Sequence, residues 1–173
     1  MIMYRLGLAL AALAIAASPM AQAGAERAPR LRVRSFNDLP QPIPLPYQEA
    51  ADAEKAVAAA RERAQRTRKL LLIDLGGNWC LDCRLLAGVL ELPEMAPFVR
   101  RHFEFVSVDV GRFDRNLAIP ARYGLAKLHG VPALLVVDPV SGRLVNRGRE
   151  EALADARSMS PQALADWLAQ WTR

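Results

Sequence analysis

The stretch from Leu70 to Cys83 has the sequence LLLIDLGGNWCLDC and decides how the chain folds. Its first six residues are almost all apolar, which is typical of a short strand buried on both faces. Gly76-Gly77 ends this strand, and apolar residues then recur at helical spacing as far as Val89. The stretch therefore predicts strand, turn and helix, with Cys80 at the start of the helix and Cys83 one turn inside it.

The two cysteines are placed for thiol–disulfide chemistry. Two cysteines separated by two residues can close a small disulfide ring. At the start of a helix, free N–H groups and the helix dipole stabilise a thiolate. Because only the thiolate attacks a disulfide, this placement activates Cys80, and the less exposed Cys83 would resolve the mixed disulfide.

A single CxxC pair has two other interpretations. It can be half of a zinc site, or a structural disulfide without redox function. The chain has no second CxxC, and its two histidines, His102 and His129, lack ligand spacing to each other. The strand–turn–helix context favours the redox interpretation, and we expect no metal.

The N-terminal region has the pattern of an export signal. Arg5 supplies the positive charge, residues 6–17 form the apolar core, and Ala21-Gln22-Ala23 is a small-residue cleavage site. An apolar core of this length is short for crossing about 30 Å of hydrocarbon, so we expect a cleaved signal over residues 1–23 rather than an anchor. Export predicts a periplasmic, oxidising compartment, where disulfides persist.

Length and composition predict one globular domain behind this signal. The chain has 173 residues, 52% of them hydrophobic, enough for one core but few for two. Five prolines oppose helix and central strand between residues 24 and 46, so we interpret 24–46 as an extended arm or tether and 47–173 as the domain. The basic residues behind the net charge of +5 are scattered among acidic ones, which argues against nucleic-acid binding.

The remaining sequence alternates helices and strands. Apolar spacing predicts helices at about 48–69, 93–101, 116–123 and 160–171. Ser160 is the expected N-cap of the last helix, with Pro161 in its first turn. Short apolar runs predict further strands at 103–110, 131–137 and 143–146. This alternation implies an α/β layer fold.

Three features together resemble the thioredoxin superfamily. Residues 79–83, WCLDC, are similar to its WCxxC active site, and Asp74 lies in the strand six residues before the first cysteine. Gly130-Val131-Pro132 resembles the segment that carries the family's cis-proline opposite the disulfide. The match covers about residues 69–146 and implies a thioredoxin-like fold with a central mixed β-sheet flanked by helices. The chain is most similar to periplasmic thioredoxin-like reductases, including the C-terminal domain of the transmembrane reductase DsbD.

The resemblance implies roles for the residues around the predicted Cys80–Cys83 disulfide. Asp74 would exchange protons with Cys83 near neutral pH, because burial in an apolar strand raises the pKa of a carboxyl group. The alternative is an aspartate at the strand end that is bonded to nearby backbone. Pro132 would be cis and Val131 would contact both sulfur and substrate, whereas an ordinary trans proline is the commoner case.

Trp79 would lie over the active-site surface and offer substrate an apolar face, unless it is simply a core aromatic. Two positions depart from the best-known relatives. Where thioredoxins have a lysine near the buried aspartate, the aligned residue is Phe105, which leaves the tuning of Asp74 open. Asp82 would oppose the Cys80 thiolate and make the pair less oxidising, unless it points to solvent. The polar loop 111–116 is either specific to a partner or an ordinary capped loop.

We therefore predict a periplasmic thiol:disulfide oxidoreductase that reduces or exchanges disulfides in exported proteins through a Cys80/Cys83 dithiol–disulfide cycle. The reaction needs no small-molecule cofactor, but a reductase in an oxidising compartment needs a membrane-embedded thiol electron donor. We expect a monomer. One alternative is a disulfide oxidase or isomerase with the same site. The other is a binding module on the thioredoxin scaffold, or a thiolate metal carrier.

Overall fold

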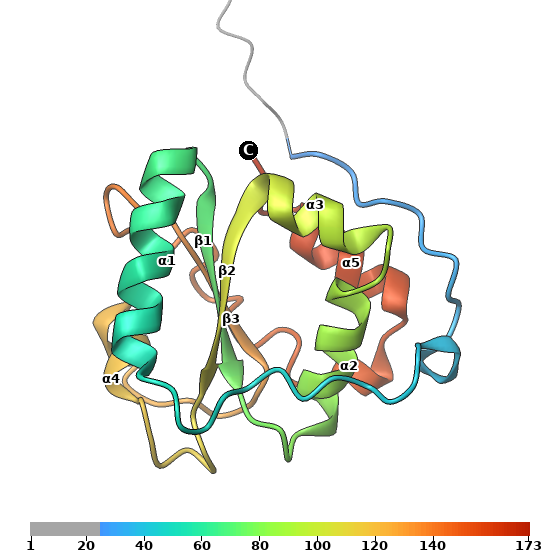
Figure 1. The fold of residues 1–173 in the computed structure, drawn as a ribbon, viewed down its shortest axis with the longest axis horizontal. Coiled ribbons are helices and arrows are strands. Elements are labelled where there is room, and N and C mark those ends of the chain that lie inside the picture. The colour runs from blue at the N-terminus through green and yellow to red at the C-terminus, as the bar shows by residue number, and fades with distance from the viewer. Residues whose placement is uncertain (1–24) are drawn as a thin grey trace, which may run out of the picture.

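The apolar run at residues 70–76 forms the central strand of a β-sheet that has helices on both faces (Figure 1). The structure is a computed structural model that describes residues 25–173, and in this part of the chain the sheet has three strands in the order β2-β1-β3. β1 (Leu70–Gly76) pairs in parallel with β2 (Phe103–Asp109) and antiparallel with β3 (Ala133–Val137). The predicted α/β fold with a central mixed sheet is confirmed.

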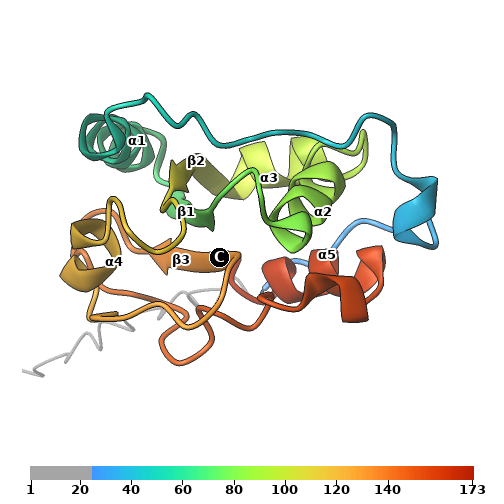
Figure 2. The same ribbon diagram turned by 90° about the horizontal axis from the view of Figure 1, so that it is seen from below.

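Successive residues of β1 point to opposite faces of the sheet and take part in two apolar cores. One core joins β1 to α1 (Ala53–Thr67) and α4 (Ala118–Arg122). The other joins it to α2 (Leu81–Leu90), α3 (Met95–His102) and α5 (Pro161–Ala169). Figure 2 shows these two groups of helices on either side of the sheet.

Local capping sets the ends of two helices. α1 begins after Asp52, whose carboxylate accepts a backbone N–H of the first turn at 3.0 Å, so the helix starts later than the predicted residue 48. Ser160 caps α5 as predicted, because its hydroxyl accepts the N–H of Ala163 at 3.2 Å. α5 ends at Ala169, two residues earlier than expected.

The prediction of a strand at residues 143–146 is wrong. Within residues 25–173 this segment forms no strand, although Leu144 makes an isolated bridge to β3. The side chain of Asn146 pairs with β3 instead: its Oδ1 accepts the N–H of Val136 at 2.9 Å, and its Nδ2 donates to Leu134 O at 2.8 Å. A side-chain amide offers the same donor and acceptor as a peptide group, so it can satisfy part of the strand edge.

The Pro-rich segment at residues 25–46, which we call the strap, is extended and runs past α5 and α2 (Figures 1 and 2). A single 3₁₀ turn, η1 (Phe36–Asp38), interrupts it. Leu39 of the strap is only 3% exposed and belongs to the core beneath it. The segment is therefore packed on the domain. The predicted signal at residues 1–23 lies outside the described residues, and no helix within 25–173 is long and apolar enough to span a membrane.

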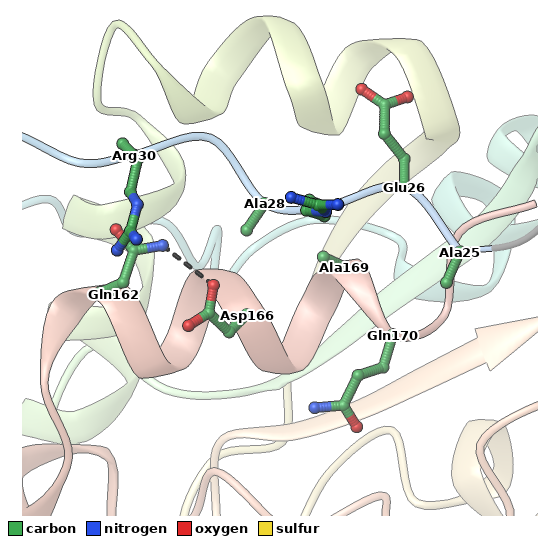
Figure 3. Close-up of a pocket in the computed structure, with 9 residues that line it drawn as sticks. Ala25, Glu26, Ala28, Arg30, Gln162, Asp166, Ala169 and Gln170 are labelled. Atoms are coloured by element: carbon green, nitrogen blue, oxygen red, sulfur yellow. Dashed lines mark hydrogen bonds between the residues drawn. The ribbon is translucent and has the colours of Figure 1, made fainter.

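Polar contacts fasten the strap to two helices. Gln162 of α5 accepts the N–H of Leu31 at 3.0 Å and donates to Pro29 O at 3.1 Å. Arg84 of α2 donates to the carbonyls of residues 43 and 44 at 3.2 and 3.1 Å. A pocket of about 510 Å³ lies between the strap and α5, beside Gln162 (Figure 3). None of its lining residues belongs to the predicted site.

Candidate active site

Cys80 and Cys83 form a disulfide at the N-terminus of α2, with their Cα atoms 5.3 Å apart. Cys80 is the N-cap residue of α2, and its Sγ accepts the N–H of Cys83 at 3.2 Å. Cys80 is 5% exposed, whereas Cys83 is fully buried. The sulfur nearer to solvent thus also lies at the positive end of a helix, where a thiolate would be stabilised.

The segment at Val131 and Pro132 packs against this disulfide. The peptide bond between these two residues is cis, and both are buried. The carbonyl oxygen of Val131 lies 3.4 Å from Cys80 Sγ. The strand predicted from residue 131 begins at Ala133, so this segment is the loop that leads into β3. Segments about fifty residues apart in the sequence thus meet at one sulfur atom.

Asp74 is fully buried in the middle of β1. Tyr47 Oη donates a hydrogen bond to Asp74 Oδ2 at 2.8 Å, and among the described residues Oδ1 has no hydrogen-bond partner. Burial raises the pKa of Asp74 to about 7, although the hydrogen bond from Tyr47 opposes this shift. The alternative of a strand-end aspartate bonded to backbone does not describe this side chain.

Sequence reasoning missed Tyr47, which no local pattern marks. It follows the strap directly and is 2% exposed. The Asn78 side chain hydrogen-bonds to both backbone groups of Tyr47: it accepts the N–H at 3.1 Å and donates to the carbonyl at 2.7 Å. Phe105, aligned with the lysine of thioredoxins, pairs with Leu72 rather than with Asp74. In this chain the polar partner of the buried aspartate is therefore a tyrosine.

The alternative that Asp82 points to solvent is wrong, and the charge of Asp82 is paired with a cation. The Asp82 side chain is 6% exposed and forms an ion pair with Arg157 in η2 (Ala156–Ser158). Arg157 Nε lies 3.0 Å from both carboxylate oxygens, and the backbone N–H of the same residue donates to Oδ1 at 2.8 Å. Burial alone would raise the pKa of Asp82, but the hydrogen bonds from Arg157 hold it below its usual value.

Trp79 lies at the surface beside the disulfide and is 44% exposed, so it is not a core aromatic. Its indole Nε1 donates to Gly111 O at 2.7 Å. The guanidinium of Arg112 stacks on the indole at 4.8 Å, and the Phe113 ring meets it edge-on at 6.1 Å. The loop 111–116 therefore packs on the indole ring next to the redox pair.

Asp109, at the end of β2, holds this loop in place. Its carboxylate accepts the N–H of Gly111 at 3.2 Å and a guanidinium N–H of Arg115 at 3.0 Å. Asn116 Nδ2 donates to the Asp109 carbonyl at 2.7 Å.

Within residues 25–173, no group of three or more His, Cys, Asp or Glu side chains is arranged to hold a metal ion.

Comparison with known proteins agrees with this geometry. The sequence model of a family described as thioredoxin-like matches residues 52–139, about half of the chain and most of the sheet with its cysteine pair. The chain belongs to the thioredoxin-like family. The predicted superfamily is thereby confirmed.

Solved structures include thioredoxin-like proteins similar to this one. A crystal structure of a disulphide isomerase from Xylella fastidiosa Temecula1 is 40% identical, with a TM-score of 0.68, and the match covers 74% of this chain and 97% of that one. The oxidised DsbD C-terminal domain of Neisseria meningitidis is 26% identical over 53% of this chain and 78% of its own, with a TM-score of 0.40. No curated protein matches the chain at a significant level.

Proposed function

We propose that this chain is a periplasmic thiol:disulfide oxidoreductase that reduces or exchanges disulfides in exported proteins. The observation that carries the proposal is the Cys80–Cys83 disulfide at the start of α2, with Val131 O 3.4 Å from the outer sulfur. Its family membership and its 40% identity to a disulphide isomerase support this chemistry. The export signal predicted at residues 1–23 supports the compartment.

The proposed cycle begins with the reduced protein. The Cys80 thiolate attacks one sulfur of a substrate disulfide, which forms a mixed disulfide, breaks the substrate S–S bond and releases the other substrate sulfur as a thiolate. Asp74 takes the proton of Cys83, whose thiolate attacks Cys80 Sγ. The Cys80–Cys83 disulfide forms again, and the second substrate sulfur leaves and is protonated. Two electrons have passed from the protein dithiol to the substrate.

Substrate would lie over Cys80, the more exposed of the two cysteines. Trp79 and Leu81 precede and follow this residue in the sequence and are 44% and 43% exposed, so both can offer apolar contact to a substrate. Val131 O lies 3.4 Å from Cys80 Sγ, and Pro132 follows Val131 directly. We propose that these residues hold a polypeptide substrate across the disulfide. The partners would then be exported proteins that contain disulfides.

The direction of electron flow separates the two candidate functions. Each reductive turnover leaves the protein oxidised, so a reductase needs a membrane-embedded thiol donor that returns two electrons. An isomerase breaks one substrate disulfide and forms another, with no net transfer of electrons. The name of the Xylella protein favours this second candidate.

The decisive experiment measures activity and potential together. Wild type should reduce insulin disulfides in the presence of a dithiol, and Cys80→Ser and Cys83→Ser should both abolish turnover, with Cys83→Ser trapped as a mixed disulfide. A reduction potential near about −270 mV would support a reductase, about −180 mV an isomerase and about −120 mV an oxidase. Wild type without any dithiol-dependent activity would instead indicate a binding module, and the proposal would fail.

A further inference from the structure

Tyr47 joins two parts of the molecule that are distant in sequence. Its ring is buried, its hydroxyl donates to Asp74 Oδ2 at 2.8 Å, and its backbone is bracketed by Asn78, two residues before Cys80. The Asn78 side chain supplies a donor and an acceptor to the backbone of Tyr47. Tyr47 is therefore fixed to the active-site turn by its main chain and to β1 by its side chain.

The hydroxyl of Tyr47 also lies close to the buried cysteine. A Cβ atom added at Gly76 would overlap Tyr47 Oη and lie 2.8 Å from Cys83 Sγ. Both atoms therefore approach the same point, and the absence of a side chain at Gly76 gives them room. Asp74 Oδ1, which has no partner within the described residues, is left to accept a proton.

The surroundings of Asp74 leave Tyr47 as its polar partner. Across the sheet its neighbours are Ser107 on β2 and Leu134 on β3, neither of which is titratable. The titratable group that contacts Asp74 from another element is Tyr47, and Cys83 Sγ of α2 lies beside the same position at Gly76 that Tyr47 Oη approaches. Asp109 at the end of β2 acts on Tyr47 through its charge, and is paired with Arg115 at 3.0 Å.

We infer that Tyr47 is a positioning residue for the resolving step: its hydroxyl holds the Asp74 carboxylate in the orientation, and in the charged form, that accepts the proton of Cys83. This inference rests on the proposed function. Burial and the charge of Asp74 raise the pKa of Tyr47 well above its ordinary value, so its hydroxyl remains a donor at neutral pH. A hydrogen bond donated to the carboxylate favours the charged form of Asp74, whereas burial favours the neutral form.

The resolving step can be followed with Ellman's reagent, an aromatic disulfide that releases a coloured thiolate. Attack by Cys80 on the reagent releases one equivalent, and attack by Cys83 on the resulting mixed disulfide releases a second. Stopped-flow measurements against pH therefore give separate profiles for the two steps. In wild type we expect the second phase to rise with pH through about 7, where Asp74 titrates.

In Tyr47→Phe we expect the midpoint of the second phase to move up by about one pH unit, which slows this phase about fivefold at pH 7, because a hydrogen bond to a charged group is lost. The first phase should not change. The matched control is Tyr123→Phe, which removes the hydroxyl of another buried tyrosine in the same core cluster and should leave both phases unchanged.

A second variant tests the inference even if Tyr47→Phe does not fold. With 3-fluorotyrosine at position 47, whose hydroxyl is a stronger acid and donor, the midpoint should move down. A second-phase profile that superimposes on wild type in either variant would overturn the inference, as would equal slowing of both phases. If wild type itself releases only one equivalent, it is the proposed function that fails.

Discussion

Two buried carboxylates of the candidate active site have opposite electrostatic character. Asp74 in β1 receives a hydrogen bond from the neutral Tyr47, and burial raises its pKa to about 7. Asp82 is buried too, but Arg157 supplies a cation and a backbone N–H, which together hold its pKa below the usual value. Burial by itself therefore does not decide the charge of a carboxyl group here; the nature of its partner does.

This difference separates two tasks at one site. Asp74 can gain and lose a proton within the working pH range, as a proton acceptor for a buried thiol must. Asp82 keeps its charge and ties the first turn of α2 to η2 through Arg157. We interpret the first carboxylate as serving the reaction and the second as stabilising the helix that carries the disulfide.

The largest effect is expected from Asp74→Asn. In wild type the folded state holds a proton on Asp74 up to about pH 7, whereas the unfolded chain releases it near 3.8, so stability falls as pH rises through this window. Above pH 7 the penalty reaches about 4 kcal/mol, and the variant escapes it. Denaturant unfolding of the oxidised proteins at pH 4 and pH 8 should show a gain for the variant only at pH 8.

The same substitution should slow the resolving step and remove its rise through neutral pH, because an amide accepts no proton from Cys83. If Asp74→Asn exchanged disulfides as fast as wild type across pH, this carboxylate would have no part in proton transfer, and the contrast with Asp82 would be purely structural.

A smaller effect is expected from Arg157→Met, which leaves Asp82 buried without its cation. We expect a loss in the free energy of unfolding at pH 7 that is larger than for an ordinary surface substitution but smaller than for a fully buried pair, because the Arg157 side chain is 57% exposed. Since the pKa of Asp82 is lowered in the folded state, its contribution is present at neutral pH and is lost on acidification through that pKa. The wild-type advantage should therefore shrink in denaturant titrations at pH 3.

The control for this variant is Arg149→Met, which changes an exposed arginine and should alter stability by less than about 0.5 kcal/mol. If Arg157→Met and Arg149→Met lowered the free energy of unfolding equally, the ion pair with Asp82 would not stabilise the fold. The structural role that we assign to Asp82 would then be wrong.

The smallest effect is expected from Asp82→Asn on the reduction potential. Arg157 already balances the charge of Asp82, so removing this charge should shift the potential by less than about 15 mV, or about threefold in the redox equilibrium. Equilibration with glutathione buffers measures this directly. A shift of about 30 mV or more would show that the charge of Asp82 reaches the sulfurs despite its partner.

Local patterns predicted the elements that hold the disulfide. The apolar run of β1, the glycine turn and the helical spacing after Cys80 lie within twenty residues, so the sequence alone placed the redox pair at a helix start. The strand expected at residues 143–146 failed for a physical reason: the side chain of Asn146 makes hydrogen bonds that a strand backbone would have made.

The partners of the two carboxylates could not be predicted in this way. Tyr47 lies 27 residues before Asp74 in an irregular segment, and Arg157 lies 75 residues after Asp82 in a single 3₁₀ turn. No periodicity links positions so far apart, so both contacts depend on the tertiary fold. For this reason the sequence could identify Asp74 and Asp82 but could not identify the residue that contacts each carboxylate.

The path of the strap places the first described residues at the opposite end of the molecule from the disulfide. Glu26, near the first described residue, donates its N–H to Thr172 and pairs with Arg101 at the end of α3. α3 leads directly into the start of β2, which lies beside the start of β1 in the parallel pair. The disulfide follows the other end of β1, about 20 Å away along the strand. A surface, bead or fluorophore coupled at Ala25 would therefore hold the molecule by its far end and leave the end that carries Cys80 free.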